Sequence, residues 1–311
     1  MAAKKKIAEK KNPPPLVRRC GAVAVHYRLL EEFPAFRQNQ LDMEVMVRRR
    51  MAAGIVAKVG KPAVIPIVVH VVYKQASENI SDAQIKSQLA VLNKDYMATN
   101  TDKKKIPAVW KGLLTSTNIK FELATKDPAG KATNGITRTK TTRDSFPSDD
   151  SVKNATTGGA NPWNTAKYIN FWVCSLGNNL LGYAQFPGGP AATDGVVILN
   201  TAFGTKGSAA APFNKGRTAT HEVGHYFNLF HIWGDTQHCE GTDFVDDTPN
   251  QQKPNFGKPA FPHVTCNNGP NGDMFMNYMD YVDDDSMVMF TSGQVTRMNA
   301  AIDGMRNKLG K

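Results

Sequence analysis

The pattern of apolar positions divides the chain into a region of alternating strands and helices and a long irregular segment. The run AVIPIVVHVVY at 63–73 is rich in β-branched residues and predicts a buried strand. Further strands are expected at 119–125, 136–141, 168–176 and 194–200. LLGYAQFPGG at 180–189 predicts a short edge strand, because Pro187 cannot donate to a ladder.

Helical spacing is found in four segments. A helix is expected at about 36–54, and another follows Ser81, which is placed as an N-cap with Gln84 as its capping-box partner. Its apolar stripe is Ile85, Leu89, Leu92 and Tyr96. A third helix begins near Arg217, and a last one at about 292–308 has an apolar face made by Val295, Met298, Ile302, Met305 and Leu309.

The segment 232–288 is rich in Gly, Pro, Asn and Asp and has little periodicity. We expect irregular structure there. A loop of that length needs something besides a core to order it, such as a bound metal or a disulfide.

Charge excludes one class of function. The net charge is +11, but residues 1–61 hold 14 basic and 5 acidic residues, whereas the remainder holds 24 against 22. The stretch 222–285 is acidic, and acidic surfaces repel phosphate backbones. We therefore expect no nucleic-acid partner. No apolar run approaches the ~20 residues of a membrane span, and no secretory signal peptide is expected in the sequence as given.

Candidate chemistry is concentrated in HEVGHYFNLFH at 221–231. Positions four apart share a helix face, so His221 and His225 can bind one ion, with Glu222 beside it. A helix continuing to His231 would turn that side chain roughly 240° away from His225. The chain must bend first, and Asn228 can adopt the left-handed conformation that such a bend needs. The spacing thus predicts a zinc site.

HEVGHYFNLFHIWGD and FMNYMDY at 275–281 resemble the metzincin metallopeptidases and their methionine turn. LLGYAQFPGG, FVDDTP, GDMFMNYMDYVDDDSM and FTSGQVTRM are similar to the pappalysin family, especially its ulilysin-type members. The resemblance implies an α+β fold with a mixed twisted sheet, an active-site helix and an irregular lower subdomain ending in a helix. We expect a basic leader at 1–60 and a catalytic domain at 61–311, with an upper subdomain at 61–228 and a lower one at 229–311.

By this resemblance His221, His225 and His231 bind zinc, and Glu222 is the general base and acid. Met279 is the methionine-turn residue. Tyr281 matches the tyrosine that stabilises the oxyanion, with a residue that only lines the wall of the site as the alternative. The edge strand at 182–185 pairs with the substrate backbone. Two positions depart from the family pattern: Asn228 replaces a glycine, and Ser286 stands where relatives often have a cysteine, with Lys258 near its expected partner.

The resemblance also assigns roles outside the zinc motif. Cys239 and Cys266 form a disulfide, which argues for a secreted protein, and Cys174 is a buried free thiol. Cys20 in RRCG resembles a cysteine switch that blocks the zinc, with an incidental thiol as the alternative. Asp243, Asp246 and Thr248 are candidate calcium ligands, with a solvated acidic loop as the alternative.

Asp284 matches the floor of the pocket for Arg or Lys after the scissile bond, unless the aspartates at 283–285 are solvated or bind calcium. Self-cleavage before Arg48, Arg49 or Arg50 would then activate the enzyme.

The sequence therefore predicts a zinc-dependent endopeptidase, made as a latent proenzyme, that cleaves proteins or peptides before Arg or Lys. Its expected cofactors are Zn²⁺ and Ca²⁺, and its oligomeric state is left open. The rival interpretation is a non-catalytic protein in which zinc only orders the irregular half. Glu222 disfavours that rival, because a structural site has no need of this carboxylate.

Overall fold

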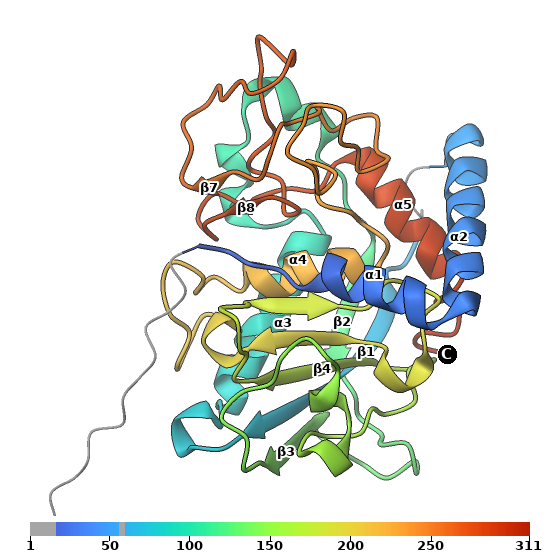
Figure 1. The fold of residues 1–311 in the computed structure, drawn as a ribbon, viewed down its shortest axis with the longest axis vertical. Helices are drawn as coiled ribbons and strands as arrows, with labels where there is room; N and C mark the ends of the chain where they lie inside the picture. The colour runs from blue at the N-terminus through green and yellow to red at the C-terminus, as the bar shows by residue number, and fades with distance from the viewer. Residues whose placement is uncertain (1–16, 56–59) are drawn as a thin grey trace, which may run out of the picture.

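The computed structural model describes residues 17–55 and 60–311. The lysine-rich start of the chain lies outside the described residues. In Figure 1 the sheet lies in the lower half of the molecule, and the segment containing β7 and β8 lies in the upper half. The helix α4 (Arg217–Tyr226) crosses between them.

The large sheet is mixed, as expected for the fold class. Its strands are β1 (Ala63–Tyr73), β2 (Ile119–Leu123), β3 (Ile136–Lys140), β4 (Ile169–Cys174), β5 (Gly182–Ala184) and β6 (Val196–Leu199). The order is β2-β1-β4-β6-β5, with β3 also paired to β1. All pairs are parallel except β5 with β6. Five of the strand predictions are confirmed within two residues at their ends. β5 is an edge strand, as predicted, but covers only 182–184 of the segment 180–189.

Alternation along the strands gives the sheet two buried faces. On β4, Phe171 and Val173 belong to the main core, whereas Trp172 and Cys174 belong to a second apolar cluster on the other side. α3 (Asp82–Tyr96) and α4 contribute to the main core. Cys174 is a buried free thiol, as expected.

Capping decides where two helices begin. Ser81 accepts a hydrogen bond from the backbone N–H of Gln84, so the N-cap of α3 is confirmed. The capping box predicted there is wrong: the Gln84 side chain instead donates to the carbonyl oxygens of Asn200 and Phe203. A complete capping box occurs at α5 (Ser292–Asp303), between Thr291 and Gln294. α5 also ends five residues earlier than predicted.

The leader forms two helices, of which one was predicted. α2 (Pro34–Ala52) corresponds to the helix expected at 36–54, and α1 (Ala22–Glu32) precedes it. α1 has no side-chain N-cap, and its Val25 and Leu29 pack into the second apolar cluster with Tyr183 and Phe186. α1 therefore depends on packing against the edge of the sheet for its stability, and α2 lies beside α5 (Figure 1).

The segment 232–288 is irregular, as predicted, apart from a two-stranded ladder of β7 (Phe256–Gly257) with β8 (Tyr281–Val282). The disulfide predicted between Cys239 and Cys266 is present. Elsewhere the connections include short 3-10 helices at Ala76–Glu78, Thr101–Lys105, Ala108–Leu113, Ser151–Lys153, Ala155–Thr157, Ala191–Thr193 and Asn200–Ala202.

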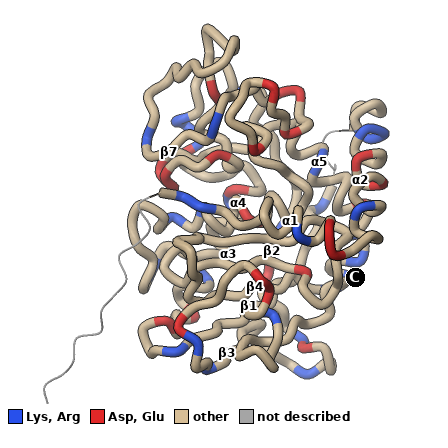
Figure 2. The backbone as a smooth tube through the Cα atoms, in the orientation of Figure 1, with Lys and Arg blue, Asp and Glu red and all other residues tan. Residues whose placement is uncertain are grey.

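Both signs of charge are distributed along the described chain, and α2 carries both (Figure 2). Within residues 17–55 and 60–311, no helix has the length and apolar character that crossing a membrane requires.

Candidate active site

α4 is buried along its whole length and carries three of the predicted site residues on one side. His221, Glu222 and His225 have relative exposures of 0%, 1% and 0%. The first turn of the helix is fixed by Arg217, whose guanidinium donates to Asp102 at 3.0 Å and to the Tyr278 hydroxyl at 3.2 Å. A helix anchored in this way holds its side chains in one orientation, as a catalytic site requires.

The bend after α4 brings the third histidine back to the first two. Asn228 has φ +75°, the left-handed conformation that the sequence predicted. The Nε2 atoms of His221, His225 and His231 then lie 3.1–3.2 Å from one another. Three ligands placed tetrahedrally at the zinc–nitrogen distance would be separated by roughly 3.3 Å. The spacing of the three nitrogens therefore fits a zinc ion.

The opposite ring nitrogens fix the tautomers. Nδ1 of His221 lies 2.7 Å from the Tyr278 carbonyl oxygen, and Nδ1 of His225 lies 2.7 Å from that of Leu229. These carbonyls can only accept, so both Nδ1 atoms donate and both Nε2 atoms keep a free lone pair. Burial lowers the pKa of His221 and His225 well below the usual value, which keeps both rings neutral. Neutral imidazoles with converging lone pairs form a metal site.

Cys20 of the leader completes this cluster. Its sulfur and one nitrogen from each of the three histidines all lie within 4.8 Å of one another. Sγ is 3.3 Å from Oε2 of Glu222, and the Ala22 backbone N–H donates to Sγ. Burial and the Glu222 charge raise the pKa of the Cys20 thiol well above its usual value. A thiolate here needs a compensating positive charge, which a zinc ion would supply.

Glu222, Tyr281 and Met279 surround the histidines. Burial raises the pKa of the Glu222 carboxyl to about 8. The Tyr281 hydroxyl accepts from the Cys20 backbone N–H at 3.3 Å, and burial raises its pKa well above the usual value, so it stays protonated. Met279 is fully buried, and a Cβ added at Gly224 would lie 2.5 Å from its sulfur. Met279 therefore packs directly beneath α4.

The leader occupies the edge of the sheet next to the histidines. The Gly21 N–H donates to the Gly182 carbonyl at 2.9 Å, and the Leu181 N–H donates to the Arg19 carbonyl at 2.9 Å. Cys20 forms a parallel bridge with Gly182 of β5. An extended segment can thus add to this strand by main-chain hydrogen bonds.

Arg18 is a functional residue that sequence reasoning missed. Its Nη2 lies 2.6 Å from Oδ1 of Asp284, and the side chains are 1% and 0% exposed. The guanidinium also donates to Thr218 and to the Val282 carbonyl and lies 5.0 Å from the ring centroid of Phe213. The only sequence signal was its place two residues before Cys20. Asp284 therefore binds a basic side chain here and is not part of a solvated run.

Asp284 has a second task at the start of α4. Its Oδ2 accepts from the backbone N–H of Lys215 at 2.7 Å and of Arg217 at 3.2 Å. A carboxylate near a helix N-terminus is stabilised by the unpaired N–H groups. Asp284 thus connects the pocket that holds Arg18 with the helix that carries the histidines.

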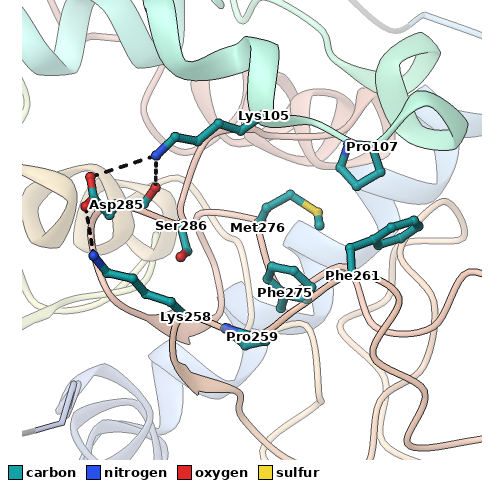
Figure 3. A pocket seen from close by; sticks show the side chains of 9 residues that line it. All are labelled: Lys105, Pro107, Lys258, Pro259, Phe261, Phe275, Met276, Asp285 and Ser286. Carbon is teal, nitrogen blue, oxygen red and sulfur yellow. Dashed lines mark hydrogen bonds and ion pairs between the residues drawn. The ribbon is translucent and has the colours of Figure 1, made fainter.

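A pocket of about 370 Å³ lies beside Asp285, next to Asp284 in the sequence, and Lys258 and Ser286 both line it (Figure 3). The positions that replace the family's cysteines therefore lie close together. Lys258 donates to Asp285 at 2.9 Å, and Lys215 also bonds this carboxylate. The two segments are linked here by the partly exposed ion pair between Lys258 and Asp285.

The proposed calcium ligands lie in one loop. Thr248 donates to both carboxylate oxygens of Asp243 at 2.9 Å, whereas Asp246 is exposed. Burial raises the pKa of the Asp243 carboxyl to about 7, a destabilisation of the charged form that a cation would offset. The neighbouring Asp247 instead caps α5 by accepting the Gly293 N–H at 2.8 Å.

Two histidines and a glutamate on one helix, a third histidine beyond a left-handed turn and a methionine beneath them define a zinc metallopeptidase. Residues 151–303 match the sequence profile of the peptidase M43 family, described as pregnancy-associated plasma protein-A. An extracellular metalloprotease of Pyricularia oryzae is 33% identical over 290 residues, 91% of this chain and 87% of that protein. Extracellular metalloprotease 1 of Coccidioides posadasii is 31% identical over 264 residues, 80% of each chain.

Two solved structures are similar over most of the chain. A mutant of Tannerella forsythia promirolysin has a TM-score of 0.86 at 46% identity and covers 94% of this chain and 96% of its own. Tannerella forsythia mature mirolysin in complex with a cleaved peptide has a TM-score of 0.79 at 51% identity and covers 80% and 96%. The chain belongs to this pappalysin family, the M43 peptidases, and is a zinc-dependent endopeptidase made as a proenzyme.

Proposed function

We propose that His221, His225 and His231 bind the zinc ion and that Glu222 is the general base and acid of peptide-bond hydrolysis. The convergence of the three Nε2 atoms beside the Glu222 carboxyl is the observation that carries this assignment. A bound zinc ion supplies Lewis acidity and lowers the pKa of water. Glu222 takes a proton from the attacking water and delivers it to the leaving amine.

Tyr281 and β5 hold the reacting peptide. The protonated Tyr281 hydroxyl reaches the backbone of the segment that lies over the histidines, so it can donate to the oxyanion of the tetrahedral intermediate. Gly182 to Gln185 would pair with the substrate backbone, because the leader already pairs with Gly182. Substrates are proteins or peptides, and the mature mirolysin structure contains a cleaved peptide.

Asp284 is proposed to select Arg or Lys immediately after the scissile bond. The support is Arg18, whose guanidinium fits this carboxylate at 2.6 Å among Thr218, Val282 and Phe213. An apolar side chain in the same place would leave a buried carboxylate without its partner, which discriminates strongly between substrates.

Latency is proposed to rest on Cys20 as a zinc ligand and on Arg18 as an occupant of the specificity pocket. Arg48, Arg49 and Arg50 remain candidate activation sites, but all three lie in α2. Cleavage there requires the last turn of α2 to unwind, because an edge strand binds extended chain. Lys61 is exposed and non-helical, so cleavage before it would give the proposed boundary between leader and catalytic domain.

We also propose that Asp243, Asp246 and Thr248 bind calcium and that the protein is secreted. The relatives named extracellular metalloproteases and the disulfide support an extracellular protein. A rise in melting temperature on adding calcium to chelated and zinc-reloaded protein would support the calcium site, and an unchanged value would count against it.

The decisive experiment for the catalytic assignment is cleavage of casein by the activated chain, with and without the change Glu222→Gln. We expect that change to lower kcat/KM at least ~10³-fold while zinc content stays the same. Retained cleavage in Glu222→Gln, or a wild-type chain that holds zinc and cleaves nothing, would favour a structural zinc. Mapping cleavage sites on denatured proteins tests Asp284 separately.

A further inference from the structure

The leader has a further attachment to the catalytic part, along the contact between α2 and α5 (Figure 1). Met43 and Val47 of α2 pack against Ala300 and Ala301 of α5 as a separate apolar cluster. Every residue of this contact that belongs to the leader precedes residue 53, so cutting the chain at 54–60 removes none of it.

A partly buried ion pair, with its arginine buried and its glutamate 29% exposed, lies beside that apolar cluster. The Glu44 carboxylate accepts two hydrogen bonds from Arg297, at 2.6 Å and 3.0 Å, and the Arg297 side chain is 1% exposed. The guanidinium carbon lies 5.5 Å and 5.7 Å from the ring centroids of Phe230 and Phe244. A bidentate contact of this kind is strong and orientation-specific.

The same carboxylate reaches the bend of the zinc motif. The Asn228 side-chain amide donates to Glu44 at 3.4 Å, and Arg297 Nε donates to the Asn228 carbonyl oxygen at 3.3 Å. Asn228 and Arg297 thus present donors to one leader carboxylate from two different elements of the catalytic part.

We propose that Arg297, Asn228, Phe230 and Phe244 form a carboxylate socket that retains the cleaved leader through Glu44. The occupant is α2 itself. Its apolar face packs against α5, and its polar side chains bind backbone carbonyl groups of the catalytic part. Asn39 donates to the Gly188 carbonyl oxygen at 2.7 Å, and Gln40 donates to that of Pro187 at 2.6 Å. This inference rests on the proposed division of the chain into leader and catalytic domain.

Activation then has two steps: cleavage after α2, followed by dissociation of the leader from the socket. Removing the Glu44 carboxylate leaves the buried Arg297 guanidinium without its charged partner. The loss of such a pair mainly raises the dissociation rate of the leader. Because Glu44 is 29% exposed on its side chain, water offsets part of this effect. Replacing Glu44 should still speed dissociation at least about tenfold.

The test uses the full chain with Glu222→Gln, to prevent self-cleavage, and with residues 55–60 replaced by the recognition sequence of an unrelated protease. After the cut, the protein is diluted and the leader that remains bound is measured over time by size exclusion and mass spectrometry. The cut chain without further changes should keep its leader, and Glu44→Gln should release it at least about tenfold faster.

Asp42→Asn is the matched control, because Asp42 is an exposed carboxylate on the same helix that accepts from Gln38. It should release the leader as slowly as the parent chain. Melting of the uncut proteins verifies that each variant folds. Equal release rates for Glu44→Gln and Asp42→Asn would overturn the proposal, and so would immediate release by the parent chain. The readout is mass and not proteolysis, so it does not depend on the catalytic role of Glu222.

Discussion

At the scale of single residues, Asn228 combines a backbone role with a side-chain role. Its left-handed conformation turns the chain so that His231 faces His221 and His225. Glycine would adopt that conformation at lower conformational strain, but it would lack the amide that donates to Glu44. This side-chain contact gives a physical reason for asparagine, and not glycine, at this bend.

Asn228→Ala should therefore lower the free energy of unfolding by about 1–2 kcal/mol, because alanine pays the full cost of the left-handed conformation. Asn228→Gly should stay within about 0.5–1 kcal/mol of the parent. Denaturant unfolding of the zinc-loaded proteins measures both values, and zinc content reports whether His231 still reaches the site. Equal stability of the Ala and Gly variants would show that the bend imposes no strain.

Arg18 and Arg19 form a natural pair for testing latency, since Arg18 is buried against Asp284 and Arg19 is exposed. Arg18→Gln leaves Asp284 buried without its guanidinium, a loss on the order of 3 kcal/mol for such a pair. The proenzyme should then activate tens of times faster, whereas Arg19→Gln should activate at the parental rate. The rate at which activity appears at fixed protein concentration measures this, and identical rates for the two variants would contradict it.

The specificity test needs a variant that spares α4. Asp284→Ala would remove the acceptor for the N–H groups of Lys215 and Arg217 as well as the pocket charge. Asp284→Asn can keep an oxygen that accepts from the N–H groups of Lys215 and Arg217. Its NH₂ group only donates, so it does not bind a basic side chain in the pocket. Cleavage sites mapped for the parent should show Arg or Lys on the primed side, and Asp284→Asn should reduce that preference. A parental profile dominated by apolar residues would refute the assignment.

At the scale of elements, the sequence predicted those strands and helices that are determined by interactions between residues close together in the chain. The strands and α3 follow from periodicity, with the Ser81 cap added for α3, and HEVGHYFNLFH contains its metal geometry within eleven residues. α1 was missed because it is stabilised by packing against residues that are distant in the sequence, such as Tyr183 and Phe186. The partners of Arg18 and Glu44 were equally out of reach, because they lie 266 and 253 residues away in the sequence.

His26 of α1 should make leader binding sensitive to acid. It is 8% exposed among aromatic rings that include Phe36, Phe186 and Phe230, and burial lowers its pKa to about 4, with the charge of Asp235 opposing that shift. A free leader has the ordinary value of 6.5. Between these two values the free form binds more protons, so docking is fully stable above pH 6.5 and weakens as the pH falls toward 4.

At pH 5 the free energy of leader docking should be about 2 kcal/mol less favourable than above pH 6.5, which is roughly thirtyfold in leader affinity. Leader release from the cut Glu222→Gln chain, compared at pH 7.5 and pH 5, measures it. His26→Phe keeps an aromatic ring but cannot titrate, so its release should change less with pH. The zinc ligands are common to both proteins, and their titration cancels in the comparison. The same acid response in both proteins would exclude His26 as its source.

At the scale of the whole molecule, two parts of the irregular half are held by different forces. Residues 274–288 extend the apolar core of the sheet, whereas residues 234–273 contribute no side chain to that cluster. In the irregular half, buried polar groups bond one another: Asn255 donates to Asp273 at 3.2 Å and to Asp280 at 3.0 Å, and burial raises the pKa of Asp280 to about 6. Such a network contributes less hydrophobic stabilisation, so covalent and metal links matter more there.

The disulfide between Cys239 and Cys266 should therefore control the stability of the irregular half more than that of the sheet. It spans 27 positions, and closing that loop contributes roughly 3.5 kcal/mol in the chain-entropy model. Both cysteines are partly exposed, so a reductant can reach them. Replacing both by serine should lower the denaturant midpoint and speed proteolysis within 232–288, while β1 to β6 keep their protection against amide hydrogen exchange. Reductant should destabilise the parent and leave the double variant unchanged. A parent that reductant does not destabilise would show that the polar network and bound metals order this half without the bridge.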